Sequence, residues 1–107
     1  MRYSVEFSED AKKDRAALDG SVQKQVNNAI YSIAKNPLPR SEGGYGTSLG
    51  HKRGRDLTGL CRIKLLKLGI QVVYKVIRDE KAMKIIVIAA RSDEEVYEIA
   101  AVRAKKD

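Results

Sequence analysis

The pattern of apolar and polar positions is clearest in the middle of the chain. Polar and apolar side chains alternate over residues 60–66, which predicts a strand with Arg62 and Lys64 on one face. Gly69 marks a tight turn, and a second alternating run over residues 70–76 predicts the other arm of a β-hairpin. Two cations are therefore expected side by side on a rigid sheet surface, where they form either a site or simply a solvated face.

The first third of the chain predicts a strand followed by two helices. Residues 2–7 alternate as a half-buried strand does, and Ser8 is placed to cap a helix that breaks at Gly20. Ser21 is expected to cap a second helix, which has apolar residues at helical spacing and ends near Asn36 because the next residue is proline. We expect the two helices to form an antiparallel pair that covers one sheet face.

The last third predicts a buried strand and a helix. Residues 83–90 form an apolar run typical of a central strand covered on both faces, and Arg91 follows directly at its end. Ser92 and Glu95 have the spacing of a capping box, so a third helix is expected to start there. Tyr97 lies about one turn into that helix and could project beside the strand end, whereas the last five residues are expected to fray.

Residues 37–56 have a different character, with both prolines of the chain, several glycines and few periodic apolar residues. We expect a long surface loop, either functional or a disordered tether. Its glycine-rich piece lacks the strand-to-helix context of a phosphate-binding loop. His51 is the only histidine and has no partner at ligand spacing, so no metal site is expected. The loop also carries three basic residues close together, Lys52, Arg53 and Arg55.

Composition narrows the class of protein. A length of 107 residues predicts one domain, residues 1–107, and 21 Lys and Arg against 14 Asp and Glu give a net charge of +7, which favours a nucleic acid or an acidic protein as partner. The single cysteine, Cys61, is expected to be a buried, inert thiol in a reducing compartment. Without a signal peptide or an apolar span, a cytoplasmic protein with no membrane partner is expected.

The predicted order β-α-α-β-β-β-α resembles the RelE/ParE superfamily of type II toxin–antitoxin toxins. The resemblance is carried best by residues 57–77, with Leu-x-Gly ahead of Arg-Ile-Lys-Leu, and by residues 85–98, whose Ala-Arg-Ser-Asp-Glu-Glu-Val-Tyr is similar to the RelE branch. It implies an α+β fold with a mainly antiparallel sheet packed by helices. For the RelE branch it implies cleavage of messenger RNA on the ribosome, without a cofactor; for ParE-like relatives it implies poisoning of DNA gyrase.

The resemblance also implies roles for individual residues. Lys64 matches a lysine with general-base or charge-stabilising work, and Arg62 matches its neighbour on the same strand. Arg91 matches a strand-end arginine that stabilises the transition state, and Tyr97 matches a tyrosine that stacks on a substrate base. Gln71 departs from the pattern, because a phosphate-binding arginine is usual there. The candidates to supply the missing charge are Lys52, Arg53 and Arg55.

The residue types suit RNA cleavage without a metal. That reaction needs the ribose 2′-hydroxyl deprotonated, the extra negative charge on phosphorus stabilised and the 5′-oxygen neutralised. Two other functions stay open: a ParE-like gyrase inhibitor without catalytic activity, and an inactive domain kept for operator binding with its antitoxin. The expected partners are an acidic, partly disordered cognate antitoxin, the ribosome with its messenger, and operator DNA reached through the antitoxin.

Overall fold

The computed structural model describes residues 2–52 and 54–106, and four consecutive strands in it stand between two α-helices before them and one after them. In chain order the elements are β1 (Ser4–Phe7), α1 (Glu9–Ala16), α2 (Gly20–Ile33), a short 3-10 helix (Arg40–Glu42), β2 (Thr47–Lys52), β3 (Arg55–Leu65), β4 (Ile70–Ile77), β5 (Ala82–Ala89) and α3 (Asp93–Lys106). No helix in the described ranges is both long and apolar enough to cross a bilayer.

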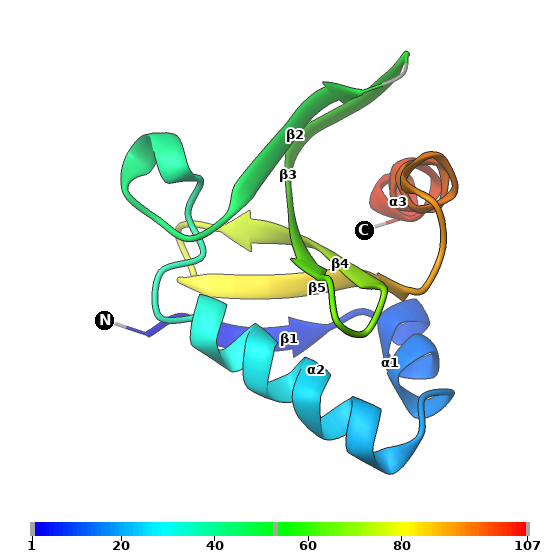
Figure 1. Cartoon of the computed structure of the whole chain (residues 1–107). Helices are drawn as coiled ribbons and strands as arrows, with labels where there is room; N and C mark the ends of the chain where they lie inside the picture. Colours follow the sequence, from blue (N-terminus) through cyan, green and yellow to red (C-terminus); the bar gives the residue numbers. More distant parts are fainter. Residues whose placement is uncertain (1, 53, 107) are drawn as a thin grey trace.

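The strands form one sheet in the order β1-β5-β4-β3-β2. β1 runs parallel to β5, and the other neighbours are antiparallel, so the expected α+β class with a mainly antiparallel sheet is confirmed. The predicted hairpin is β3 and β4, and Gly69 in its turn has a φ of 65°. Figure 1 shows β2 and β3 rising together from the rest of the sheet as an arm.

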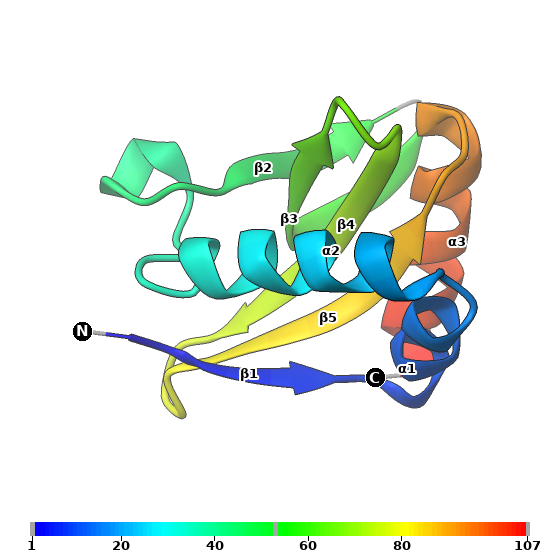
Figure 2. The same cartoon turned by 60° about the horizontal axis from the view of Figure 1, so that its bottom comes forward.

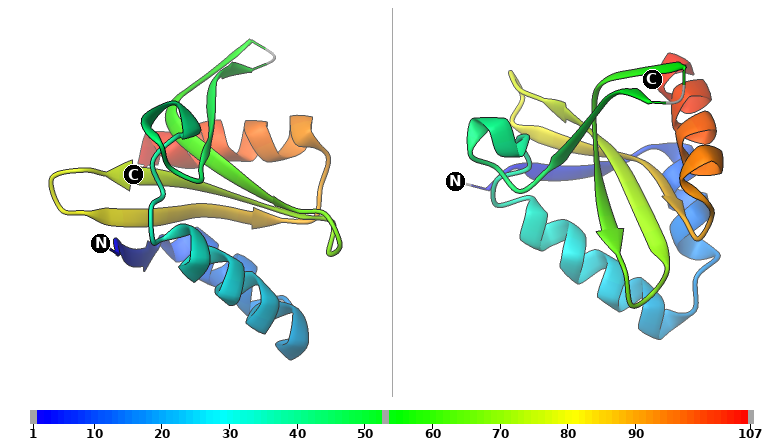
Figure 3. Two further views of the ribbon diagram at one scale, coloured as in Figure 1. Left: turned by 60° about the vertical axis from the view of Figure 1, so that its left-hand side comes forward. Right: turned by 45° about the horizontal axis from the view of Figure 1, so that its top comes forward.

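Each sheet face carries its own apolar cluster. α1 and α2 lie on one face and α3 on the other, so β4 and β5 are covered on both sides (Figures 1 and 3). The cluster between the sheet and α2 includes Ile30, Tyr74 and Met83, all fully buried. Figure 2 shows α2 lying along this face of the sheet. Cys61 is buried in the same cluster, as expected, and burial raises the pKa of its thiol.

Two of the three predicted helix caps are correct. The Ser8 hydroxyl accepts a hydrogen bond from the Ala11 N–H at 3.1 Å, as expected. The prediction for the second helix is wrong, because its cap is Asp19, whose carboxylate accepts from the Val22 N–H at 3.1 Å. Asp19 has the extended backbone that a cap requires, whereas Ser21 already lies inside the helix and donates its hydroxyl to Asp19. α2 ends at residue 33, three residues before the expected end.

The predicted loop over residues 37–56 is wrong, because this segment contains the 3-10 helix, β2 and the start of β3. β2 is an edge strand that pairs only with β3, so its sequence lacks the alternation of a strand buried on one face; Leu49 alone is buried. The preceding turn is held to the sheet because the Tyr74 hydroxyl donates to the Pro37 carbonyl at 2.8 Å. A side chain on Gly46 would collide with that hydroxyl.

The capping box at the start of α3 is confirmed. The Ser92 hydroxyl accepts from the Glu95 N–H at 3.3 Å and donates to the Glu95 carboxylate at 3.2 Å. The expected fraying of the tail is wrong up to Lys106, because cations of the last turns pair with α1. Arg103 lies 2.6 Å from the Asp14 carboxylate, and Lys106 lies 2.8 Å from that of Asp10.

Candidate functional site

A β-bulge in β3 determines that Arg62 and Lys64 lie on the sheet face that α3 covers. Gly59 has a φ of 87°, and the register of the β2–β3 ladder shifts at this point. Leu57 before the bulge and Leu60 after it consequently pack in the same cluster beneath α3, although their spacing is not that of a regular strand. Alternation resumes beyond the bulge, so Arg62 and Lys64 continue on the α3 side.

The first residue of α3, Asp93, lies among these side chains. Its carboxylate is 3.3 Å from the Lys64 ammonium and 3.8 Å from the Arg62 guanidinium. Gln71, which pairs with Lys64 across the β3–β4 ladder, donates its side-chain N–H to Asp93 at 2.6 Å. Three residues predicted from the sequence therefore meet at one carboxylate.

Tyr97 completes the group one helical turn after Asp93. Its hydroxyl accepts a hydrogen bond from Arg62, and the Arg62 guanidinium also lies 5.9 Å from the centre of the Tyr97 ring. Tyr97 is only 3% exposed, so its ring is covered where the sequence predicted that a substrate base would stack. We call Arg62, Lys64, Gln71, Asp93 and Tyr97 the Asp93 cluster.

The electrostatics of the cluster favour an ionised carboxylate. Partial burial tends to raise the pKa of Asp93, but the hydrogen bonds from Gln71 and Lys64 and the charges of Lys64 and Arg62 outweigh it, so the pKa is lowered. Asp93 is therefore negative at neutral pH, against two cations. About a third of the Asp93 and Lys64 side chains is exposed, 33% and 36%, so the cluster is open to a ligand. The side-chain oxygen of Gln71 is buried and has no hydrogen-bond partner within the described residues.

The other predicted site residues lie outside this group. Arg91 lies before α3, is exposed and pairs with Glu95 in the first turn of that helix, at 3.2 Å. Arg55 pairs with Glu98 of α3 at 3.4 Å, while Lys52 is exposed at the tip of the β2–β3 arm. Arg53 lies outside the described residues. The structure thus gathers Arg62, Lys64, Gln71 and Tyr97 and contributes one residue that the sequence reasoning missed.

The missed residue is Asp93. Acidic side chains in the first turn of a helix are commonplace, because they complement the helix dipole, and that reading accounts for Asp93 in the sequence. Its contact with Lys64 joins residues 29 positions apart. No periodicity or motif signals such a contact; the long strand pair and the packing of α3 create it.

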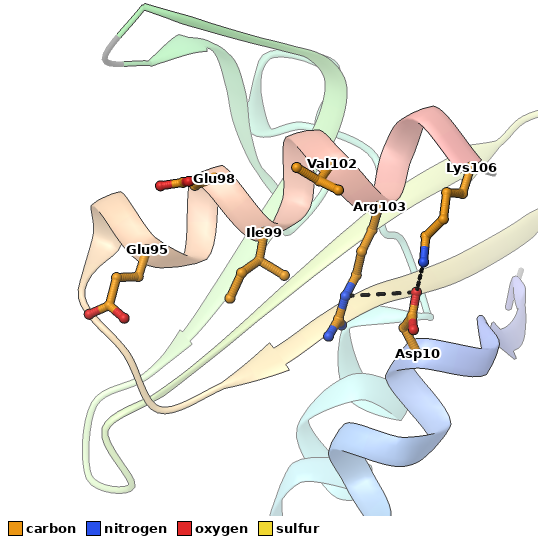
Figure 4. Close-up of a pocket in the computed structure, with 7 residues that line it drawn as sticks. All are labelled: Asp10, Glu95, Glu98, Ile99, Val102, Arg103 and Lys106. Atoms are coloured by element: carbon orange, nitrogen blue, oxygen red, sulfur yellow. Dashed lines mark ion pairs between the residues drawn. The ribbon is translucent and has the colours of Figure 1, made fainter.

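A separate pocket lies between α1 and α3, away from the cluster. Its lining residues in Figure 4 are Asp10, Glu95, Glu98, Ile99, Val102, Arg103 and Lys106. The carboxylate of Asp10 is engaged by Lys106 and Arg103, at 2.8 and 3.9 Å. These charges neutralise each other and fasten the end of α3 to α1, so we assign the pocket a structural role. The described residues contain no group of three or more His, Cys, Asp or Glu side chains that could hold a metal ion.

Comparison with known proteins shows which proteins the chain is similar to. No family model matches the chain. A RelE-like toxin protein of Escherichia coli is 28% identical over 106 residues, which cover 98% of this chain and all of the relative. The mRNA interferase toxin RelE of Escherichia coli K12 is 27% identical over 97 residues, covering 91% of this chain and 92% of the relative.

Solved structures agree. The free-state structure of an Escherichia coli RelE mutant superposes with a TM-score of 0.75 at 26% identity, covering 96% of this chain and 98% of that one. The RelBE2 toxin–antitoxin complex of Mycobacterium tuberculosis contains a chain of the same fold, with a TM-score of 0.67 at 19% identity over 87% of this chain and 95% of that one. In sequence and in fold, the chain is similar to RelE-like toxins of toxin–antitoxin systems.

Proposed function

We propose that this protein is the toxin of a type II toxin–antitoxin system and that it inhibits translation by cleaving messenger RNA on the ribosome. The observation that carries the proposal is the Asp93 cluster, in which two cations of the sheet lie against the start of α3, and the Tyr97 hydroxyl of that helix accepts a hydrogen bond from Arg62. A relative that is 27% identical over 92% of its own length is named an mRNA interferase. Support therefore comes from chemistry and from similarity independently.

The cations of the cluster suit a phosphate that gains negative charge during cleavage. Arg62 offers a planar donor fork that can hold two phosphate oxygens, and Lys64 offers a mobile ammonium. The Arg62 guanidinium is pre-positioned, because the Tyr97 hydroxyl accepts one of its N–H groups. Arg91 is proposed to add a further donor once substrate draws it away from Glu95. With these cations in place, the reaction is proposed to need no metal ion.

The open shape of the site supports dependence on the ribosome. The Asp93 cluster is a partly exposed surface rather than a deep cavity, so it has little means of its own to orient a flexible RNA. Positioning of reactants supplies several kcal/mol of barrier lowering in many enzymes. We propose that the ribosome provides this positioning by presenting the messenger to the cluster.

An acidic antitoxin is the proposed cognate partner, with operator DNA bound through it. The net charge of +7 favours a partner of opposite charge. A chain with the same fold was solved as part of a toxin–antitoxin complex. An acidic segment that folds over the sheet and the basic face would prevent RNA from reaching the cluster, and its affinity should fall only in part with added salt because apolar burial is not screened.

The test is a translation reaction with purified protein, in which 5′-ends on ribosome-bound messenger are mapped. Positioned cleavage supports the proposal, and Lys64→Ala should reduce it about a hundredfold or more. The matched control is Lys24→Ala, which removes an exposed lysine from α2 on the opposite sheet face and should cleave normally. Intact messenger with gyrase-trapped DNA would instead favour a gyrase inhibitor, and neither effect would favour an inactive interaction domain.

A further inference from the structure

We propose that Asp93 is the general base of the cleavage reaction, with Lys64 acting as the proton donor. This inference rests on the proposed ribonuclease function and assigns its proton transfers. The carboxylate of Asp93 would accept the proton of the attacking ribose 2′-hydroxyl, while Arg62 and Lys64 hold the scissile phosphate. Asp93 is thus a catalytic residue, although the family resemblance pointed to Lys64 for this task.

The contacts at Lys64 carry the assignment. Its ammonium donates to the Asp93 carboxylate at 3.3 Å, and an ammonium has three donors but no lone pair with which to accept a proton. In the described part of the chain, Asp93 is the only carboxylate that forms an ion pair with Arg62 or Lys64. It is therefore the carboxylate available to the groups that would bind phosphate.

Gln71 gives Asp93 the orientation that a base needs. Its side-chain N–H donates to one carboxylate oxygen at 2.6 Å, whereas the cations approach the other oxygen. When phosphate draws Arg62 and Lys64 away, Gln71 still holds the first oxygen, and the second becomes free to accept a proton. This makes Gln71 a positioning residue and explains why glutamine, 7% exposed, serves at a position where an arginine was expected.

The proton transfers balance within this group of residues. The 2′-hydroxyl proton moves to Asp93, the 2′-oxygen forms a bond to phosphorus, and the bond from phosphorus to the 5′-oxygen breaks. Lys64 donates a proton to the departing 5′-oxygen. The products are a 2′,3′-cyclic phosphate and a 5′-hydroxyl end. The proton then passes from the carboxylic acid of Asp93 to the neutral amine of Lys64, which restores both groups.

The Asp93 carboxylate could instead be an inhibitory plug, that is, an internal ligand that occupies Arg62 and Lys64 and competes with phosphate for them. The two ideas predict opposite effects when the charge is removed. A base contributes about 10²- to 10⁴-fold to rate, so losing it slows cleavage. Losing a plug would strengthen RNA binding and speed cleavage. The choice therefore depends on one substitution and its control.

The experiment compares wild type, Asp93→Asn and Glu94→Gln in single-turnover cleavage of ribosome-bound messenger. Glu94 is the next residue, is exposed and carries the same charge, so its variant controls for charge near the helix start. We expect Asp93→Asn to cleave at least a hundredfold more slowly and Glu94→Gln to stay within about twofold of wild type. Binding to a messenger with a 2′-deoxyribose at the mapped cleavage position should be equal or tighter for Asp93→Asn. Cleavage by Asp93→Asn at the wild-type rate or faster would overturn the assignment.

A second variant covers the case in which Asp93→Asn folds poorly. Asp93→Glu keeps a carboxylate on a longer stem and should cleave at least tenfold faster than Asp93→Asn; equal rates would overturn the base role. Thermal unfolding checks that all variants are folded. If the wild-type protein left the messenger intact, the proposed function would be wrong. If wild type and Asp93→Asn were equally active, only the assignment of Asp93 as the general base would be wrong.

Discussion

The two faces of the sheet are built for different purposes. Beneath α1 and α2 the buried positions are apolar, and Tyr74, the largest side chain there, satisfies its hydroxyl within the protein. Beneath α3 the apolar cluster fills only part of the face, and Asp93 with its partners occupies the part under the start of the helix. We call the face under α1 and α2 the closed face, because its core cluster is apolar. The face under α3 is apolar at one end and charged at the other.

The difference teaches how a small domain keeps an ionic site without losing its fold. β4 alternates, so Val72 and Tyr74 point to the closed face while Gln71 points to the Asp93 cluster. The charged side chains of the cluster lie at one end of one face, where solvent reaches Lys64 and Asp93 and desolvation costs less than in the interior. Substitutions on the closed face should change stability, and substitutions in the cluster should change activity.

The largest expected effect is on the closed face. Tyr74→Ala removes a fully buried ring and should lower the free energy of unfolding by about 3–5 kcal/mol. Tyr74→Phe keeps the ring but leaves the Pro37 carbonyl without its donor, so a smaller loss of about 1–3 kcal/mol is expected. Urea unfolding of both variants measures this. A loss of less than about 1 kcal/mol for Tyr74→Ala would contradict the statement that this face of the sheet is a tightly packed core.

Arg91 should show the reverse pattern. Arg91→Ala truncates an exposed side chain, so stability should change by no more than about 0.5 kcal/mol, while messenger cleavage should fall about a hundredfold or more. Glu95→Gln is the matched control, because it removes the ion pair with Arg91 but keeps a residue suited to the capping box. Cleavage rates and growth arrest measure the effect. Growth arrest by a folded Arg91→Ala variant at the wild-type dose would contradict the role.

A smaller effect is expected for three basic residues that follow one another closely in the sequence. Replacing Lys52, Arg53 and Arg55 together by alanine should lower cleavage roughly tenfold, since phosphate contacts add to affinity one by one. Arg55 is the best placed of them, because Glu98 holds it beside α3. A triple variant with the wild-type rate would show that the arm is a solvated face.

The smallest expected effect is on stability in acid. Asp93, Asp10 and Asp19 have pKa values lowered by their hydrogen bonds and, for Asp93 and Asp10, by neighbouring cations. A carboxyl whose pKa is lower in the folded state stabilises the fold above its unfolded pKa, about 3.9, and loses that contribution as pH falls through the folded value. Melting temperatures from pH 7 to 3 should therefore decline below about pH 4. The difference between wild type and Asp93→Asn should shrink over the same range, and a difference that grew would contradict the sign.

Local pattern was enough for most elements of this protein. Alternation over residues 60–76 predicted the central hairpin, and the apolar run after residue 82 predicted a strand covered on both faces. The Ser92 and Glu95 capping box located the start of α3. These features depend on neighbours along the chain, and the physics that produces them acts over a few residues.

Tertiary structure alone decided the rest. β2 has no buried alternation because it lies at the sheet edge, so only its pairing with β3 reveals it. The bulge at Gly59 and the packing of α3 bring Asp93 to Lys64 across 29 positions of sequence, and the same packing directs Tyr97 to Arg62. A sequence pattern records which face a side chain prefers. It does not record which distant side chain it will meet there, because that depends on how separately formed elements pack together.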